Sequence, residues 1–339
     1  MAKTRVVSIG GLKLGGGNPI RVQSMCNTST RDVAATVAQI KRLEAAGCEL
    51  VRVAVPDMES ARALAGIKAQ INIPLIADIH YEPALALASI PYVDKLRLNP
   101  GTMPKAKLAE IIAAARHIPI RVGINSGSLE RGFLGTRVEQ MLASVEQNIR
   151  LLKSKGFSDI VVALKSSEVN ETIEAYRRFS RKYDYPLHLG LTEAGSGSQG
   201  LIKSAICLGV LLKEGIGDTI RVSLTGDPVN EVKAAYDILR AVGLRKRGIE
   251  FVSCPTCGRT SVDLEPIVNQ IKQELSTVIK PIKVAIMGCE VNGPGEAKEA
   301  DFGLAFSKAR GYIFSKGKIL KQVPVETAVA EFVALIKGS

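Results

Sequence analysis

The feature that most constrains the fold is a regular alternation of short apolar, β-branched runs with longer amphipathic stretches through the first two thirds of the chain. Eight such runs follow one another at the spacing of one strand, one helix and two loops. They are Val22–Met25, Val51–Val55, Leu75–Ile79, Lys95–Asn99, Ile120–Ile124, Ile160–Leu164, Leu187–Leu191 and Thr219–Leu224. The intervening segments carry apolar residues at helical spacing, as in Val33–Ala46, Glu59–Gln70 and Val138–Lys155. The pattern favours an α/β protein with a (β/α)8 TIM barrel, and a doubly wound open sheet is the alternative.

The rhythm changes after the helical stretch Val229–Val242, where the basic, glycine-flanked segment Gly243–Glu250 is typical of a linker. We expect a small α+β domain beyond it. Its elements are strands at Ile249–Val252, Lys283–Met287 and Phe302–Phe306, a hairpin at Gly311–Val323, and helices at Leu264–Ile279 and Val325–Ile336. The sequence therefore predicts two domains, residues 1–243 and residues 244–339. Near the start, Gly10–Gly17 is expected to form a hairpin that covers the barrel floor.

Composition excludes several classes of protein. Hydrophobic residues make up 46% of the chain and charged residues 23%, which is ordinary for a soluble globular protein. No apolar run approaches the length of a membrane span, and the N-terminus lacks the apolar core of a signal peptide. We therefore expect a cytoplasmic protein that does not act in a membrane.

The charge balance predicts an anionic partner. Lys and Arg number 45 against 33 Asp and Glu, a net charge of +12. Such a balance attracts nucleic acid, phosphorylated metabolites or acidic proteins. Aromatic residues are only 4% and Trp is absent, which is poor for stacking unpaired bases. A phosphorylated small molecule is the favoured partner, rather than nucleic acid.

Polar residues cluster where the predicted barrel strands end, which is where TIM barrels place their active sites. They are Gln23, Ser24, Arg52, Asp78, His80, Arg97, Asn99, Arg121, Asn125, Ser126, Lys165, Ser166, Ser167, Glu193, Arg221 and Ser223. Any one of the five cations among them could be a solvated charge or a member of a buried ion pair. Five cations at one rim instead need an anion, and two phosphates or one diphosphate would suit. His80 and Glu193 are the candidate proton-transfer groups.

Three of the six cysteines form a constellation in the second domain. Cys254 and Cys257 make a CxxC turn directly after a strand, and Cys289 lies in a glycine- and proline-rich loop. A redox pair would not need Cys289, and structural zinc would require a fourth ligand that the sequence nearby lacks. A [4Fe–4S] cluster on three cysteines would leave one iron for an oxygen ligand, for which Glu296 is suitably placed. The spacing favours the cluster over zinc.

The remaining cysteines, Cys26, Cys48 and Cys207, are expected to be buried as small apolar residues. Their uneven spacing in a long chain does not indicate a disulfide framework.

The motifs that contain the three cysteines of the second domain resemble those of a known family. CPTCGRT (Cys254–Thr260) and GCEVNGPGE (Gly288–Glu296) are similar to the cluster motifs of bacterial 4-hydroxy-3-methylbut-2-enyl diphosphate synthases, enzymes of the non-mevalonate isoprenoid pathway. The resemblance extends in order along nearly the whole chain. It covers VQSM (Val22–Met25), VRVAVPD (Val51–Asp57), ADIH (Ala77–His80), KLRLNPG (Lys95–Gly101), RVGINSGSL (Arg121–Leu129), LHLGLTEAG (Leu187–Gly195) and RVSLTGDP (Arg221–Pro228).

The resemblance implies an oxidoreductase with a substrate-binding TIM barrel and a [4Fe–4S] domain resembling those of sulfite and nitrite reductases. It implies a homodimer in which the barrel of one subunit and the cluster domain of the other form the active site. The implied substrate is 2-C-methyl-D-erythritol 2,4-cyclodiphosphate, whose reductive ring opening and dehydration give 4-hydroxy-3-methylbut-2-enyl diphosphate. The implied electron donor is flavodoxin or ferredoxin, which the basic residues of the second domain would suit.

Residue by residue, Cys254, Cys257 and Cys289 match the family's thiolate ligands and Glu296 its fourth, carboxylate ligand. The positions that match diphosphate-binding residues are Arg52, His80, Arg97, Arg121, Ser126, Lys165, Arg221 and Ser223. Asp78, Glu193 and Asn292 match polar residues near the reacting carbons, and Glu193 is the favoured proton donor.

Some positions depart from the family pattern. Cys26 stands where the family usually has Thr, and Tyr81 replaces a phenylalanine. The inserted domain of plant-type members is absent, which favours the shorter bacterial form.

Two other classes of protein stay open. One is a nucleic-acid-binding module whose three cysteines hold zinc and whose positive charge contacts phosphates. The other is a barrel aldolase or sugar-phosphate enzyme in which Lys165 forms a Schiff base.

Overall fold

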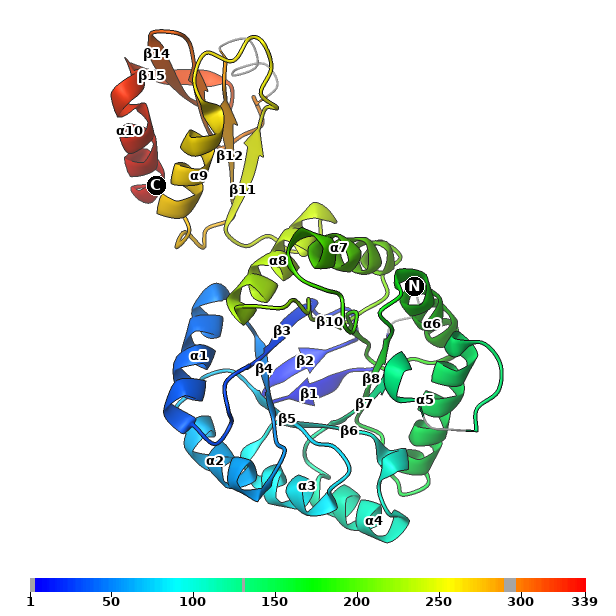
Figure 1. Cartoon of the computed structure of the whole chain (residues 1–339). Coiled ribbons are helices and arrows are strands. Elements are labelled where there is room, and N and C mark those ends of the chain that lie inside the picture. Colours follow the sequence, from blue (N-terminus) through cyan, green and yellow to red (C-terminus); the bar gives the residue numbers. More distant parts are fainter. Residues whose placement is uncertain (1–3, 130–131, 290–296) are drawn as a thin grey trace. The chain divides into compact units, whose positions relative to one another are not determined.

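The computed structural model describes residues 4–129, 132–289 and 297–339. The chain divides into two compact units, Met1–Arg245 and Lys246–Ser339, each with its own sheet (Figure 1). Each unit is described by itself below.

The first unit is a barrel of eight parallel strands. The strands are β3 (Arg21–Met25), β4 (Leu50–Ala54), β5 (Leu75–Asp78), β6 (Lys95–Leu98), β7 (Ile120–Asn125), β8 (Ile160–Lys165), β9 (His188–Leu189) and β10 (Thr219–Ile220). They follow the order β8-β7-β6-β5-β4-β3-β10-β9, and a parallel bridge between Val162 and Leu187 joins the two ends of this sheet. The predicted barrel is confirmed, and the open sheet is excluded.

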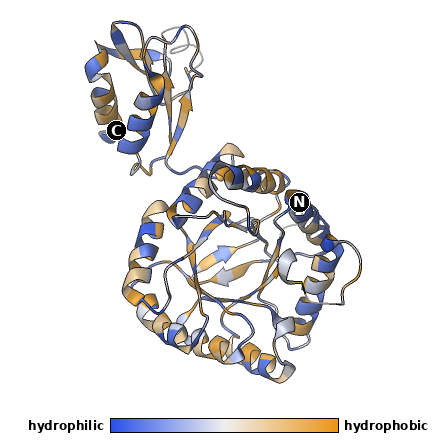
Figure 2. Cartoon of the chain, viewed as in Figure 1, coloured by the Kyte–Doolittle hydropathy of each residue, from blue (hydrophilic) through white to orange (hydrophobic). Residues whose placement is uncertain are grey.

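In the described residues of this unit, eight α-helices surround the strands (Figure 1). They are α1 (Val33–Ala46), α2 (Met58–Lys68), α3 (Pro83–Ser89), α4 (Lys105–Ala114), α5 (Arg137–Lys153), α6 (Val169–Lys182), α7 (Gly197–Lys213) and α8 (Pro228–Ala241), with short 3-10 turns at Ile90–Tyr92, Pro100–Thr102 and Ser126–Ser128. In α1, Val37, Ile40 and Leu43 are buried at helical spacing, so one face of the helix packs on the strands. Apolar residues accordingly concentrate on the strands, and polar residues colour the outer sides of the helices (Figure 2).

Two strands before the barrel close its floor. Strands β1 (Val7–Ile9) and β2 (Leu12–Leu14) form an antiparallel hairpin. Its buried Val7, Ile9 and Leu14 pack on residues of the early barrel strands, such as Leu50 and Ile76. The sequence predicts a floor hairpin at Gly10–Gly17; the structure has one at residues 7–14, with Gly10 and Gly11 forming its turn in a positive-φ conformation.

The last two barrel strands are shorter than the sequence predicts. The parallel ladder ends at Leu189 in β9 and at Ile220 in β10. The residues expected to continue it, Leu191, Arg221 and Ser223, instead line the cavity described below.

The second unit is a five-stranded sheet with two helices on one face. The strands β11 (Ile249–Ser253), β12 (Ile282–Met287), β13 (Phe302–Phe306), β14 (Arg310–Ser315) and β15 (Lys318–Pro324) follow chain order, with parallel pairing as far as β13 and antiparallel pairing after it. Helices α9 (Leu264–Glu274) and α10 (Val325–Lys337) bury their apolar residues against the same face of the sheet. The predicted α+β unit is confirmed. Helix α9 ends earlier than predicted, because Ser276–Ile279 is rich in β-branched residues with low helix propensity.

No helix of the described part of the chain combines the length and the apolar character that crossing a membrane requires.

Candidate active site

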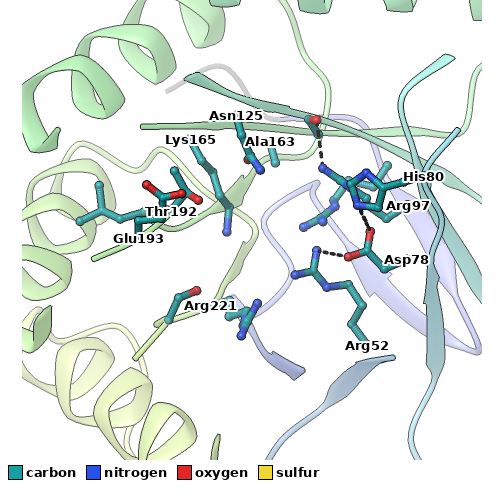
Figure 3. A pocket seen from close by; sticks show the side chains of 14 residues that line it. Arg52, Asp78, His80, Arg97, Asn125, Ala163, Lys165, Thr192, Glu193 and Arg221 are labelled. Atoms are coloured by element: carbon teal, nitrogen blue, oxygen red, sulfur yellow. Dashed lines mark hydrogen bonds and ion pairs between the residues drawn. The ribbon is translucent and has the colours of Figure 1, made fainter. Parts of the chain in front are cut away.

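A polar cavity of about 270 Å³ opens at the ends of the barrel strands (Figure 3). Its lining is unusually rich in charged side chains. The lining residues are Arg52, Asp78, His80, Arg97, Arg121, Gly123, Asn125, Ala163, Lys165, Leu191, Thr192, Glu193, Arg221 and Ser223. The five cations singled out in the sequence therefore share one cavity. Figure 3 shows Glu193 and Lys165 on one side of it and Arg52, Asp78, His80 and Arg97 on the other.

Asp78 is the central carboxylate of this cavity. Its Oδ1 accepts a hydrogen bond from Arg97 Nη1 at 3.1 Å, and its Oδ2 lies 3.6 Å from Arg52 Nη1. Burial acts to raise the pKa of Asp78, but Arg52, Arg97 and Arg121 outweigh it and lower that pKa to about 2. Asp78 is therefore ionised at neutral pH and holds two guanidinium groups in place.

The neighbourhood of Arg97 depends on a glycine. Arg97 Nη2 donates to the carbonyl oxygen of Gly123 at 3.4 Å, and a Cβ at Gly123 would lie only 3.1 Å from Arg97 Nε. Arg97 Nη1 also contacts His80 Nε2. Burial, followed by the charge of Arg97, lowers the pKa of His80, so its imidazole is neutral at pH 7.

Arg121 and Lys165 are the cations without a counterion. Among the described residues, no carboxylate lies within ion-pair distance of either. Buried Arg121 leaves Nε and Nη1 without a hydrogen-bond partner in that same part of the chain. Burial and the neighbouring arginines lower the pKa of Lys165 well below its ordinary value. Unpaired buried donors of this kind are costly, and an anion in the cavity would satisfy them.

Lys165 also depends on a glycine for space. A Cβ at Gly190 would lie 2.7 Å from Lys165 Nζ and 2.5 Å from the carbonyl oxygen of Arg221. Gly190 therefore leaves room for the lysine to reach the cavity.

Glu193 lies on the cavity wall in a strained conformation. Its φ of 52° is in the left-handed region, which a residue with a Cβ seldom adopts. Such strain concentrates at functional sites. Here the exposed carboxylate of Glu193 lies at the wall of the cationic cavity.

Ser126 is the one predicted diphosphate-binding residue that does not line the cavity. Ser126 lies in the turn that follows β7, and its hydroxyl donates at 3.1 Å to Oγ of Ser166, which follows β8. Asn125, one residue earlier, lines the cavity, as expected for a polar residue at the C-terminal end of a barrel strand. Thr192 also lines the cavity, although the sequence does not single it out. Its position next to Glu193 after the seventh strand was the available signal.

The three cysteines of the second unit gather at one end of its sheet. Strands β11 and β12 run parallel, with Ser253 opposite Ile286, so Cys254 and Cys289 follow neighbouring strand ends. The backbone N–H of Gly288 donates to Cys254 Sγ at 3.2 Å. Ser261 N–H donates to the Gly288 carbonyl at 2.8 Å, which holds the CxxC turn against the Cys289 strand end.

The donor set at this sheet end suits a soft metal centre. Cys257 is exposed, Cys254 is half-buried, and an N–H···S bond of the Gly288 type is common around iron–sulfur clusters. As they stand, the described side chains include no group of three or more potential ligands close enough to hold a metal ion. Asn292 and Glu296 lie outside the described residues.

The other cysteines are not among the residues that line the cavity. Cys26, Cys48 and Cys207 are buried, and burial raises the pKa of each thiol to about 12. The expectation that they serve as small apolar residues is confirmed.

Fold and site together define a class: a TIM barrel with a cation-rich mouth, followed by a small α+β unit that carries a three-cysteine motif. The chain belongs to the GcpE family. The family model "GcpE TIM-barrel domain" matches residues 4–236, and "GcpE protein C-terminal domain" matches residues 250–338.

Similar proteins match nearly the whole chain. A protein of Thermodesulfovibrio yellowstonii is 54% identical over 329 residues, which are 95% of this chain and 94% of the relative. A protein of Caldanaerobacter subterraneus is 53% identical over 342 residues, covering 98% of this chain and 96% of the relative. Both are named 4-hydroxy-3-methylbut-2-en-1-yl diphosphate synthase (flavodoxin).

Solved structures support the barrel alone. The dihydropteroate synthase of Stenotrophomonas maltophilia superposes with a TM-score of 0.55 at 15% identity, covering 70% of this chain and 97% of that one. The dihydropteroate synthase of Xanthomonas albilineans gives 0.53 at 15% identity, covering 70% and 98%. At such identity the similarity is one of fold.

Proposed function

We propose that this protein is an oxidoreductase that converts 2-C-methyl-D-erythritol 2,4-cyclodiphosphate to 4-hydroxy-3-methylbut-2-enyl diphosphate. The overall reaction consumes two electrons and two protons. The bond between ring carbon C2 and its phosphate oxygen breaks, the C3 hydroxyl leaves as water, and a C2–C3 double bond forms. The diphosphate stays on the product.

The observation that carries the proposal is the cavity in which five cations face one another with too few carboxylates to neutralise them. Arg121 and Lys165 lack a counterion among the described residues, so an incoming diphosphate would supply the missing negative charge. The relatives' shared name, which specifies a diphosphate, supports the same chemistry.

We assign the diphosphate-binding role to the cavity cations together with nearby polar groups. The set is Arg52, His80, Arg97, Arg121, Ser126, Lys165, Arg221 and Ser223. Guanidinium forks match phosphate oxygens bidentately, so these residues would position the ring and stabilise the charge on the departing phosphate oxygen. The neutral imidazole of His80 would serve as a hydrogen-bond donor there.

Glu193 is the proposed proton donor, and Asp78 and Asn292 are proposed to act near the reacting carbons. Glu193 is suited to this role because its strained backbone presents its carboxyl group at the cavity wall, where the leaving hydroxyl would need a proton. Asp78 would act through the two arginines that it holds.

A [4Fe–4S] cluster is the proposed cofactor, held by Cys254, Cys257, Cys289 and Glu296. When bound, such a cluster supplies electrons and Lewis acidity at an open iron. The cysteines of neighbouring strand ends, with the Gly288 N–H on Cys254 Sγ, support this assignment.

The proposed partners follow from the same chemistry. Reduced flavodoxin is the favoured electron donor, as the relatives' name specifies, and ferredoxin is the alternative. The basic side chains Lys308, Arg310, Lys316, Lys318 and Lys321 would suit such an acidic partner. We also propose a cytoplasmic homodimer whose subunits share the active site. In each subunit, residues 1–243 would bind the substrate and residues 244–339 would hold the cluster.

Anaerobic turnover of the cyclodiphosphate with reduced flavodoxin tests the proposal, and product is measured by phosphorus NMR. Wild type should release one product for every two electrons consumed. Glu193→Gln should lower kcat by about 10²-fold or more while substrate still binds. Wild type that binds the cyclodiphosphate but returns it unchanged under reducing conditions would contradict the proposal.

A further inference from the structure

Glu231 is a buried carboxylate that lies outside the cavity lining yet contacts one of its cations. It lies in the first turn of α8. Its Oε2 accepts from Ser24 Oγ at 2.9 Å, and its Oε1 accepts from the backbone N–H of Leu224 at 3.1 Å. Glu231 therefore links α8 to β3 and to the segment that follows β10.

The main partner of Glu231 is Arg221. Arg221 Nε lies 3.3 Å from Oε2, and Arg221 Nη2 lies 3.3 Å from Oε1. These two parallel contacts form a fork that fixes the plane of the guanidinium as well as its position. Within the described part of the chain, the remaining nitrogen, Nη1, donates only to the weakly accepting Met25 Sδ at 3.5 Å.

Charge explains why Arg221 needs this partner. Asp78 pairs with Arg52 and Arg97, and Glu231 is the carboxylate within ion-pair distance of Arg221 among the described residues. Arg52 also feels the charge of Arg221, which acts to lower its pKa. Without a fixed counter-charge, a flexible arginine surrounded by like charges would turn away from them.

We propose that Glu231 is a positioning residue, which holds the Arg221 guanidinium with its free edge available to the diphosphate. This inference rests on the proposed diphosphate-binding role of the cavity, and it adds a residue that never touches the substrate. Buried Ser24 supports this role, because its hydroxyl donates to the Glu231 carboxylate and so holds it in position beside Arg221.

Two other roles for Glu231 make different predictions. If Glu231 were merely a nearby negative charge, its neutralisation would strengthen anion binding. If it only stabilised α8, its loss would weaken binding whether or not Arg221 were present. A positioning role weakens binding only through Arg221.

The test is calorimetric titration of the full-length, anaerobically purified protein with inorganic pyrophosphate. Glu231→Gln should weaken pyrophosphate binding by about tenfold. In an Arg221→Met background, the same substitution should have almost no further effect, because the group that it positions is gone. Ser24→Ala keeps the carboxylate but loosens it, and should weaken binding by about threefold; this variant decides the question if Glu231→Gln does not fold.

Asp227→Ala is the matched control on the same helix. Asp227 caps α8 by accepting from Val229 N–H at 3.0 Å and pairs with Arg42, whereas Arg221 pairs with Glu231. It should lower Tm and leave pyrophosphate affinity unchanged. Unchanged or tighter binding in Glu231→Gln, equal weakening with and without Arg221, or no binding by wild type would each overturn the inference. Failure of cyclodiphosphate turnover with intact pyrophosphate binding would instead count against the proposed function alone.

Discussion

Asp78 and Arg97 lie directly opposite each other on the neighbouring parallel strands β5 and β6, with Asp78 Oδ1 3.1 Å from Arg97 Nη1. Both side chains are buried at the cavity, and Arg52 approaches the other carboxylate oxygen. One carboxylate thus supports two of the five cations. The pair explains how a barrel can bury so much positive charge before any ligand arrives.

Replacement of Asp78 by Asn should therefore destabilise the fold as well as impair binding. Removal of one partner of a buried ion pair leaves uncompensated charge and costs about 3 kcal/mol or more. We expect a lower Tm and at least tenfold weaker pyrophosphate binding in Asp78→Asn, measured by calorimetry. Asp57→Asn is the control, because Asp57 pairs with the exposed Arg31 in a solvent-screened contact, and its Tm should fall far less than that of Asp78→Asn.

The same carboxylate predicts the acid sensitivity of wild type. Because the pKa of Asp78 falls from 3.8 to about 2 on folding, its stabilising contribution is complete above about pH 4. That contribution, about 2 kcal/mol, is lost as pH falls toward 2. Denaturant unfolding in this range should show a smaller pH dependence in Asp78→Asn. Identical slopes would contradict the assignment.

Anion binding should be accompanied by proton uptake at Lys165. Burial and the nearby arginines lower the pKa of this amine, and a bound diphosphate would raise it again. In the window between the lowered pKa and the ordinary 10.5, binding therefore takes up protons, and affinity falls as pH rises. Titrations in buffers of different ionisation enthalpy measure this uptake. Lys165→Met should take up fewer protons than wild type, and an equal uptake would refute the prediction.

Gly190→Ala should disable the cavity without a change at any charged residue. The new Cβ would lie 2.7 Å from Lys165 Nζ and 2.5 Å from the carbonyl oxygen of Arg221, so the lysine or the local backbone must shift. We expect pyrophosphate affinity to fall about tenfold or more. Gly127→Ala is the nearby control, because a Cβ at Gly127 meets nothing within 4 Å. Equal affinities of the two variants would show that Lys165 needs no such space.

Gly288→Ala should disturb the cysteine motif from its backbone. A Cβ at Gly288 would lie 2.7 Å from Thr260 Cγ2, and Thr260 Oγ1 accepts from the Cys257 N–H at 3.1 Å. We expect a lower iron content per chain after anaerobic purification. Gly258→Ala lies in the same motif, where a Cβ meets nothing within 4 Å, and should retain its iron. The reverse order of iron contents would contradict the proposed packing.

The barrel could be predicted from sequence because its parallel strands are buried on both faces and so appear as continuous apolar runs, as in Ile160–Leu164. The cations of the cavity could be predicted because they interrupt or directly follow these apolar runs. A charged residue within or just after an apolar strand, such as Arg97 or Arg121, has few explanations other than a ligand or an ion pair.

What could not be predicted depends on contacts between distant segments. Glu231 lies on an amphipathic helix with no local sign of function, and its role appears only when Ser24 and Arg221 are seen beside it. Ser126 follows a strand end like its neighbours, but its hydroxyl turns to Ser166. The sequence predicts that a polar residue lies at the end of a barrel strand. The direction in which its side chain points depends on its hydrogen-bond partners, which come from other segments.

The most direct test of the central claim is the metal content of the anaerobically purified protein, measured with its visible absorption in wild type and in Cys289→Ser. A [4Fe–4S] enzyme should show broad absorption near about 400 nm and about four irons with matching sulfide per chain, lost in Cys289→Ser. One zinc per chain and a colourless protein would contradict a reductive mechanism.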